Sequence, residues 1–317
     1  MNSASLSRDG SEAASADRST SIAFVLMVLL AGGNAVAIRI SNFGLPPFWG
    51  AALRGTGAAL VFWVIVAVRR VALPRGRALL GAMLYGLMAI GVTYASIYWG
   101  LVRLPAGVSA PLLALVPLMT LFLARAHGLE ELRWRSVAGA LIATAGVFIG
   151  LAGGFGRALH LPSVLALVVG TAFLAEGAVV FKLFPKSHPL AANAVAFTTG
   201  APILVVLSRL MGEKWSLPTT ASTWAAFAYL VLPGSVMVFY LYLQVLSRWT
   251  ASATAYSFLL IPVATVVVAA LVLGEAITTS FVAGAALVLA GVWVGAIQGP
   301  PEAVEAVCPE LPSRAVC

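Results

Sequence analysis

The fold is decided by two stretches that resemble each other. They read "LVRLPAGVSAPLLALVPLMTLFLARAHGLEELRWRSVAGALIATAGVFIG" (residues 101–150) and "LSRWTASATAYSFLLIPVATVVVAALVLGEAITTSFVAGAALVLAGVWVG" (residues 246–295). Aligned without gaps at an offset of 145, they are identical at 17 of 50 positions. Shared apolar composition would not also align Pro117 with Pro262 and Glu130 with Glu275. Earlier in each half, an offset of 143 gives a weaker match that pairs Pro46 with Pro189. The chain is therefore an internal duplication.

The composition indicates a membrane protein. Of its 317 residues, 61% are hydrophobic and only 9% are charged, whereas an average soluble domain has roughly 25% charged residues. Ten apolar segments are each about long enough to cross roughly 30 Å of hydrocarbon as a helix. Their predicted spans are 21–40, 48–68, 78–98, 105–124, 134–152, 162–181, 190–208, 221–243, 250–272 and 278–297.

The duplication divides these spans into two repeats of five, residues 21–152 and 162–297, flanked by a disordered N-terminal arm (1–20) and a disordered tail (298–317). Because five is odd, the second repeat enters the membrane from the opposite side. This inverted arrangement, common in secondary transporters, lets a central cavity open alternately to each side. The sequence thus predicts an all-α membrane protein with two inverted five-helix repeats around a central cavity. A signal peptide ending near "AVA" (residues 35–37) is the alternative for the first span, but the repeat needs that helix.

The net charge of +8 is explained by topology rather than by nucleic acid, because Lys and Arg lie between the apolar runs. With the N-terminus in the cytoplasm, 13 of the 19 basic residues fall on the inner side. The positive-inside rule therefore places both termini in the cytoplasm. The two cysteines, Cys308 and Cys317, lie in the tail and leave the redox compartment open.

The chain resembles the EamA-like branch of the drug/metabolite transporter superfamily. The resemblance rests on "GGNAVAIRI" (32–40), "LPPFWGAALRG" (45–55), the Pro–Thr–Glu run 117–130 with its echo 262–275, and the glycine-spaced fifth and tenth spans. It implies a multi-pass protein of the bacterial inner membrane that exports amino acids, other small metabolites or drugs. The chain departs from the pattern at Ala31, where many members carry Trp, and in its cysteine-containing tail.

Two charged residues inside apolar spans are the leading site candidates. Glu176 lies in the stretch "GTAFLAEGAVVFK" (170–182) of the sixth span. A charged acid facing lipid is costly, so Glu176 must face the interior, be paired or be protonated. It would bind a substrate amine or couple transport to protons, and the alternative is a structural pair. Arg54, six residues into the second span, would bind a carboxylate or phosphate, or else pair with a backbone carbonyl.

The remaining candidate residues are polar, aromatic or helix-breaking. Asn34 and Gln244 could bind substrate or hydrogen-bond a neighbouring helix, and Tyr94, Tyr98 and Tyr240 could line the pocket or belong to an interfacial belt. Pro117 and Pro262 should bend the fourth and ninth spans beside the transport path, with Thr120 and Thr265 satisfying the backbone groups that proline frees.

Three further patterns favour structural roles. Glu130 and Glu275 should cap helices or pair loops, and Arg39 and Lys182 should snorkel to the interfaces. The GxxxG faces at 146–150 and 291–295 permit close helix approach within the chain or in a homodimer.

No catalytic, metal or cofactor motif stands out, and the three histidines, His127, His160 and His188, fall in separate loops. The sequence favours a secondary active transporter that exports small metabolites such as amino acids by alternating access, with a small-molecule substrate and the lipid bilayer as its partners. Coupling to protons through Glu176 is a secondary expectation. A carrier of phosphorylated sugars or nucleotide-sugars and an integral membrane lipid-modifying enzyme remain as alternatives.

Overall fold

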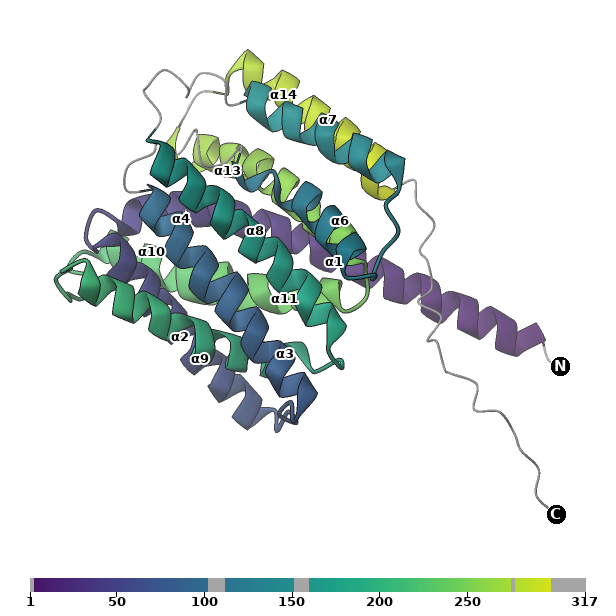
Figure 1. Ribbon diagram of the computed structural model, residues 1–317, viewed down its shortest axis with the longest axis horizontal. Coiled ribbons are helices and arrows are strands. Elements are labelled where there is room, and N and C mark those ends of the chain that lie inside the picture. The colour runs from purple at the N-terminus through teal and green to yellow at the C-terminus, as the bar shows by residue number, and fades with distance from the viewer. Residues whose placement is uncertain (1–2, 102–111, 151–159, 275–276, 298–317) are drawn as a thin grey trace.

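The computed structural model describes residues 3–101, 112–150, 160–274 and 277–297, and within these ranges the chain is helical, with no strand (Figure 1). The α-helices of the first half are α1 (Ser3–Ser41), α2 (Pro47–Val68), α3 (Arg77–Tyr85), α4 (Thr93–Leu101), α6 (Val116–Ala126) and α7 (Trp134–Gly150). Those of the second half are α8 (Leu161–Leu183), α9 (Pro189–Leu210), α10 (Ala221–Val231), α11 (Val238–Leu246), α12 (Ala251–Ala255), α13 (Ser257–Leu273) and α14 (Thr279–Val292). Two π-helical segments join helices, η1 (Gly86–Val92) between α3 and α4 and η3 (Leu232–Met237) between α10 and α11, and a third, η4 (Trp293–Ile297), follows α14.

These helices correspond to the ten predicted spans. Seven helical stretches of the described residues are long and apolar enough to span a membrane: 18–38, 47–68, 77–100, 161–183, 189–210, 221–246 and 251–272. Three shorter apolar helices, 116–126, 134–150 and 279–295, overlap the predicted fourth, fifth and tenth spans. The prediction of an all-α membrane protein of about ten helices is confirmed.

The two halves run in opposite directions, as the contacts between equivalent helices show. On α7 and α14, a Cβ on Gly139 would lie 2.5 Å from the backbone of Gly295, whereas a Cβ on Gly146 would lie 2.6 Å from the carbonyl oxygen of Gly284. Residue numbers rise along one helix and fall along the other, so these neighbours in Figure 1 are antiparallel. On α2 and α9, Gly55 contacts Ala201 and the Trp63 indole donates to Thr198. The repeats therefore have inverted topology.

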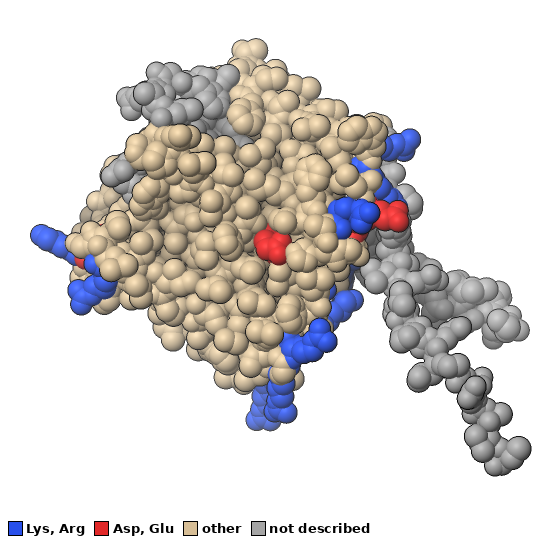
Figure 2. Space-filling model, in the orientation of Figure 1, with Lys and Arg blue, Asp and Glu red and all other residues tan. Residues whose placement is uncertain are grey.

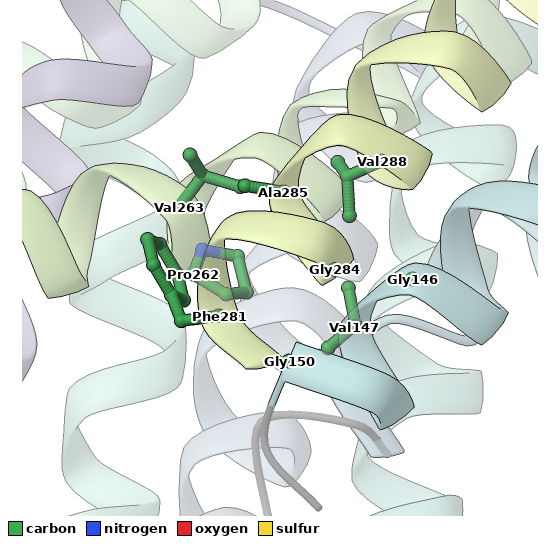
Figure 3. Close-up of a pocket in the computed structure, with 9 residues that line it drawn as sticks. All are labelled: Gly146, Val147, Gly150, Pro262, Val263, Phe281, Gly284, Ala285 and Val288. Carbon is green, nitrogen blue, oxygen red and sulfur yellow. The ribbon is translucent and has the colours of Figure 1, made fainter. Parts of the chain in front are cut away.

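The GxxxG faces pack on each other inside the chain. Figure 3 shows Gly146 and Gly150 of α7 facing Gly284 of α14 across a seam of apolar side chains. Pro262 of α13 borders the same seam, which encloses a void of about 10 Å³, too small for a substrate. Both glycine faces are thus used to join the repeats to each other, and a homodimer would need another surface.

Substituting a glycine of this seam is expected to destabilise the protein. In Gly291→Ala the new Cβ would lie 2.5 Å from both the Ala143 nitrogen and the Gly139 oxygen, and backbone atoms in packed helices cannot easily move aside. Overpacking of this kind costs about 1–3 kcal/mol, which should lower the unfolding temperature measured in detergent. In the control Gly50→Ala, the nearest atom is the Leu45 Cβ at 3.5 Å, an ordinary contact. Equal unfolding temperatures for the two variants would contradict this packing.

The N-terminal residues differ from the prediction of a disordered arm, because α1 begins at Ser3 and is 39 residues long (Figure 1). Residues 3–20 contain no proline and are rich in Ala, Ser and charged residues. They continue a helix that the first span has already nucleated, so only the easier propagation step is needed. The predicted disordered tail, 298–317, lies outside the described residues.

Charged side chains gather at opposite ends of the molecule. Figure 2 shows Lys and Arg mostly along the rims, with a broad face between them that is almost free of charge. Large apolar side chains such as Leu60, Val64 and Leu271 are exposed in the described helices. An apolar band between charged ends is the surface that a lipid bilayer covers.

Candidate functional site

The third and eighth spans each contain a π-helical segment in the same place. At the offset of 145, η1 (Gly86–Val92) corresponds to residues 231–237, and η3 spans Leu232–Met237. Such segments are rare and often occur at functional sites. Neither segment is among the elements predicted from the sequence. Their signal was weak, consisting of Gly86 in one half and the Pro233–Gly234 pair in the other.

Arg54 is held against η3 by hydrogen bonds that cross between the repeats. Its Nε donates to the Ser235 Oγ at 2.7 Å, and its Nη2 donates to the Gly234 carbonyl at 2.9 Å. The residue is only 3% exposed. Among the described residues no carboxylate forms an ion pair with the guanidinium, so a buried positive charge is held by neutral groups alone. Such a charge is costly unless an anion can join it.

Asn34 of α1 reaches the same carbonyl as Arg54. Its Nδ2 donates to the Gly234 oxygen at 3.1 Å. Its Oδ1 is buried and has no hydrogen-bond partner among the described residues. A Cβ on Gly234 would lie 2.0 Å from that Oδ1, so glycine is needed for this approach. The cluster therefore combines a buried cation with an unpartnered acceptor.

Aromatic rings close the cluster on the side of α4. The Arg54 guanidinium carbon lies 5.4 Å from the centre of the Tyr94 ring, within cation–π range. The Tyr94 ring lies 6.2 Å from the Tyr98 ring and 6.4 Å from the Phe239 ring, between ring centres. Both predicted tyrosines of the third span thus belong with Arg54, and we call Asn34, Arg54, Tyr94, Tyr98, Gly234 and Ser235 the Arg54 cluster.

The pseudo-symmetric counterpart of Arg54 shows that the fold does not require its charge. The offset of 143 relates Arg54 to Phe197, and the offset of 145 relates Tyr94 to Phe239. Phe197 and Phe239 lie edge to face with ring centres 5.0 Å apart, where the first half has its guanidinium–ring contact. The same packing is therefore achieved in the second half with apolar side chains only.

The contact of Asn34 is duplicated in the same way. Asn34 corresponds to Gly177 and Gly234 corresponds to Ala89. A Cβ on Gly177 would lie 3.0 Å from the Ala89 Cβ, so α8 approaches η1 much as α1 approaches η3. The polar groups of the Arg54 cluster are thus an addition to a symmetric framework.

Glu176 lies apart from the Arg54 cluster and pairs with His127. Its Oε1 is 2.8 Å from the His127 Nε2, and the two side chains are 24% and 35% exposed, respectively. Its Oε2 is buried and has no partner among the described residues. No described contact joins Glu176 to Arg54. This pair cannot be predicted from the sequence, where His127 follows the fourth span and stands as one of three separate loop histidines.

Two other predicted residues stay outside the cluster. Tyr240 of α11 packs against the main hydrophobic core, and the described contact of Gln244 is its backbone carbonyl, which accepts from the Ser247 hydroxyl at 2.8 Å. The described contacts bring neither side chain to Arg54.

The two prolines occupy different positions in their helices. Pro117 lies in the first turn of α6, directly after a turn at residues 114–115, whereas Pro262 lies inside α13. The expectation for the threonines is wrong. The Thr120 hydroxyl donates to the Val116 carbonyl and the Thr265 hydroxyl donates to the Gly32 carbonyl of α1, so neither donates to a carbonyl four residues before a proline.

Lys182 and Glu130 act at helix ends. The Lys182 Nζ donates to the carbonyls of Leu246, at 3.0 Å, and Trp249. It therefore caps the end of α11 instead of snorkelling to the interface, because a cation is favourable at a helix C-terminus. The Glu130 Oε1 accepts from the Ser252 amide at the start of α12, the predicted capping role. Glu275, and the side chain of Arg39, lie outside what the structure describes.

Two pockets of the described residues, neither of them the expected central cavity, lie away from the Arg54 cluster. One is the small void beside α7 and α14, and the other lies at the loops around residues 71–78 and 186–188. At the Arg54 cluster the side chains fill the space themselves, since Arg54 and Tyr98 are 3% and 7% exposed.

Comparison with known proteins places the chain among transporters. Residues 18–151 and 161–296 each match the EamA-like transporter family. The chain belongs to this family. As an EamA-like transporter it moves a solute and is not an enzyme, which removes the lipid-modifying enzyme from the alternatives.

Several curated relatives are similar to this EamA-like transporter over most of their length. The chain is 29% identical over 274 residues to the "Probable terminal-alkyne amino-acid exporter" of Streptantibioticus cattleyicolor, covering 85% of this chain and 91% of the relative. It is 27% identical over 240 residues to the "Uncharacterized inner membrane transporter YedA" of Escherichia coli K12, covering 74% and 77%. It is 26% identical over 281 residues to the "Probable amino-acid metabolite efflux pump" of Salmonella typhimurium, covering 85% and 92%.

A solved crystal structure shares the fold. It superposes with a TM-score of 0.74 at 23% identity and covers 88% of this chain and 97% of the other chain. At this identity the likeness concerns the fold alone.

Proposed function

We propose that this EamA-like transporter is a secondary active exporter of small amphiphilic metabolites such as amino acids, working by alternating access in the bacterial inner membrane. The observation that carries the proposal is the buried Arg54 guanidinium, which contacts η3 of the other repeat and has no carboxylate partner among the described residues. Relatives named as an amino-acid exporter and an amino-acid efflux pump support the same substrate class.

The Arg54 cluster offers complementary groups to an amino acid. A guanidinium has five N–H donors, and Arg54 uses one on Ser235 and one on Gly234, so further donors can bind a carboxylate. The unpartnered Asn34 Oδ1 can accept from an ammonium group. The Tyr94 and Phe239 rings beside the guanidinium provide an apolar surface for a side chain.

Alternating access would follow from the two antiparallel repeats. Because Arg54 belongs to one repeat and η3 to the other, separation of the repeats on one side must break or rearrange these hydrogen bonds. A substrate carboxylate can replace the Gly234 and Ser235 oxygens as the acceptor. The deep burial of Arg54 and Tyr98 corresponds, in this proposal, to a state closed on both sides.

The proposed energy source is a proton gradient acting through Glu176. With both termini in the cytoplasm, as the basic loops predict, Glu176 and His127 lie near the cytoplasmic end of the bundle. The two side chains share one short contact, and the other carboxylate oxygen is buried. This is a place where one proton can be taken up or released as the repeats move.

Carriers of phosphorylated sugars or nucleotide-sugars would need several basic side chains at the site. Among the described residues that form the Arg54 cluster, Arg54 is the one basic residue. A single guanidinium suits one carboxylate better than a di-anionic phosphate.

Counterflow in proteoliposomes tests the substrate class. Vesicles loaded with an unlabelled neutral amino acid should accumulate the same labelled amino acid from outside, and vesicles loaded with a sugar phosphate should not accumulate labelled sugar phosphate. Amino acids with apolar or aromatic side chains are expected to exchange best, because of the Tyr94 and Phe239 rings. Exchange of sugar phosphates without exchange of any amino acid would contradict the proposal.

A further inference from the structure

A pocket whose lining includes none of the residues of the Arg54 cluster lies at the ends of three spans. It has a volume of about 470 Å³ and is lined by residues 71–75 and Ala78, between α2 and α3, and by residues 186–188, between α8 and α9. We call it the loop groove. The transport function described above does not use it.

The loop groove is rich in uncompensated positive charge. Its two loops contain no Asp or Glu over residues 69–78 and 183–190. The structure shows no ion pair for the basic side chains there among the residues that it describes, and all of them are exposed. These basic residues are Arg69, Arg70, Arg75, Arg77 and Lys186.

The pair of loops that is pseudo-symmetric to the loop groove shows that the fold does not need these charges. The offset of 143 relates the two loops to residues 212–221 and 40–47, where Lys214 is the one basic residue. There Glu213, the counterpart of Arg70, accepts hydrogen bonds from the Phe48 and Trp49 amides at 3.0 and 2.7 Å. The pseudo-symmetric pair of loops thus has a carboxylate, Glu213, where the loop groove has a basic side chain, Arg70.

The walls of the loop groove are largely apolar and lie at the ends of membrane-spanning helices. Val71 and Leu73 line it, and Leu73 is 47% exposed. The groove is bordered by the ends of α2, α8 and α9, which are three of the membrane-spanning helices. A ligand of the loop groove must have a negatively charged group for the basic side chains and an apolar part for the walls, and an anionic phospholipid has both.

We propose that the loop groove binds the phosphate headgroup of an anionic phospholipid, with Arg75 and Lys186 as its principal contacts. These two basic side chains come from different loops and both line the groove. The lipid would therefore tie the α2–α3 connection to the α8–α9 connection, one from each repeat.

Lipid-dependent thermal stability of the purified full-length protein in detergent tests this site. Phosphatidylglycerol should raise the unfolding temperature at lower concentration than phosphatidylcholine does. Each basic residue near an anionic lipid contributes about a fivefold change in affinity, so Arg75→Gln/Lys186→Gln should require about 30-fold more phosphatidylglycerol. The matched control Arg125→Gln/Arg135→Gln removes two exposed charges from the same predicted side of the membrane, and should respond like the wild type.

Each of three other outcomes would overturn the proposal. Equal responses of the two double variants would mean that the basic loops act through general charge, as topology signals do. Equal responses of the wild type to the two lipids would exclude recognition of the anionic headgroup. If inorganic phosphate matched phosphatidylglycerol at the same concentration, the occupant would be a soluble anion.

Discussion

Replacing Arg54 by Gln is expected to lower amino-acid exchange in proteoliposomes about 100-fold. The guanidinium is 3% exposed and is held between the repeats by Gly234 and Ser235. Removing one partner of a buried, hydrogen-bonded charge pair costs about 2–5 kcal/mol, and the substrate carboxylate would lose its cation. Gln retains hydrogen-bond donors, so the side chain can still contact the Gly234 carbonyl and the fold should persist.

Two matched variants separate charge from geometry. Arg54→Lys keeps the charge but loses the planar fork, so its exchange should fall between those of the wild type and Arg54→Gln. Arg209→Gln removes an arginine of α9, whose guanidinium carbon lies 4.3 Å from the centre of the Trp215 ring, and should leave exchange close to the wild-type rate. Near wild-type exchange by a folded Arg54→Gln protein would mean that the substrate binds elsewhere.

Replacing Glu176 by Gln is expected to abolish proton-driven export while leaving exchange without a gradient intact. The amide has nearly the same shape as the carboxylic acid and can still contact the His127 Nε2, which lies 2.8 Å from Oε1. It cannot gain or lose a proton. Export driven by a pH gradient should fall at least tenfold, and counterflow at equal pH should change less than twofold.

Glu130→Gln is the control for this second prediction. Glu130 is also a carboxylate on the predicted cytoplasmic side, but it caps α12 through the Ser252 amide. It should lose little gradient-driven export. Unchanged gradient-driven flux in Glu176→Gln would remove Glu176 from the coupling step and leave its pairing with His127 as a structural contact.

Most of the fold could be predicted because hydropathy and duplication are properties of long segments. The ten spans and their inversion follow from apolar length and from the repeat at an offset of 145. Local exceptions could not be predicted. The π-helical segments η1 and η3 depend on how the third and eighth spans pack, and the helical start of α1 at Ser3 depends on propagation from the first span.

The candidate site was predictable only for residues that stand out in apolar surroundings. Arg54, Asn34, Tyr94 and Tyr98 were singled out because they are polar within a span, and the structure brings them together. The Gly234 carbonyl accepts from both Arg54 and Asn34. A glycine within an apolar segment does not stand out in the sequence as a polar side chain does.

Partners far apart in sequence were missed for the same physical reason. Ser235 contacts Arg54 across 181 residues, and His127 contacts Glu176 across 49. Neither separation follows a helical period, so only packing of the repeats can bring such residues together. A single sequence therefore identifies the charged member of such a contact but not its partner.

Accessibility of Ser235 from the two sides of the membrane tests the central claim most directly. With Cys308 and Cys317 replaced by Ser, a single Ser235→Cys substitution puts a thiol in the Arg54 cluster at a position that is 0% exposed. A membrane-impermeant maleimide is added to right-side-out and to inside-out vesicles, with and without amino acid. Alternating access around the Arg54 cluster predicts slow labelling from both sides and protection by substrate. Labelling from one side only, under every condition, would contradict a site that the two inverted repeats share.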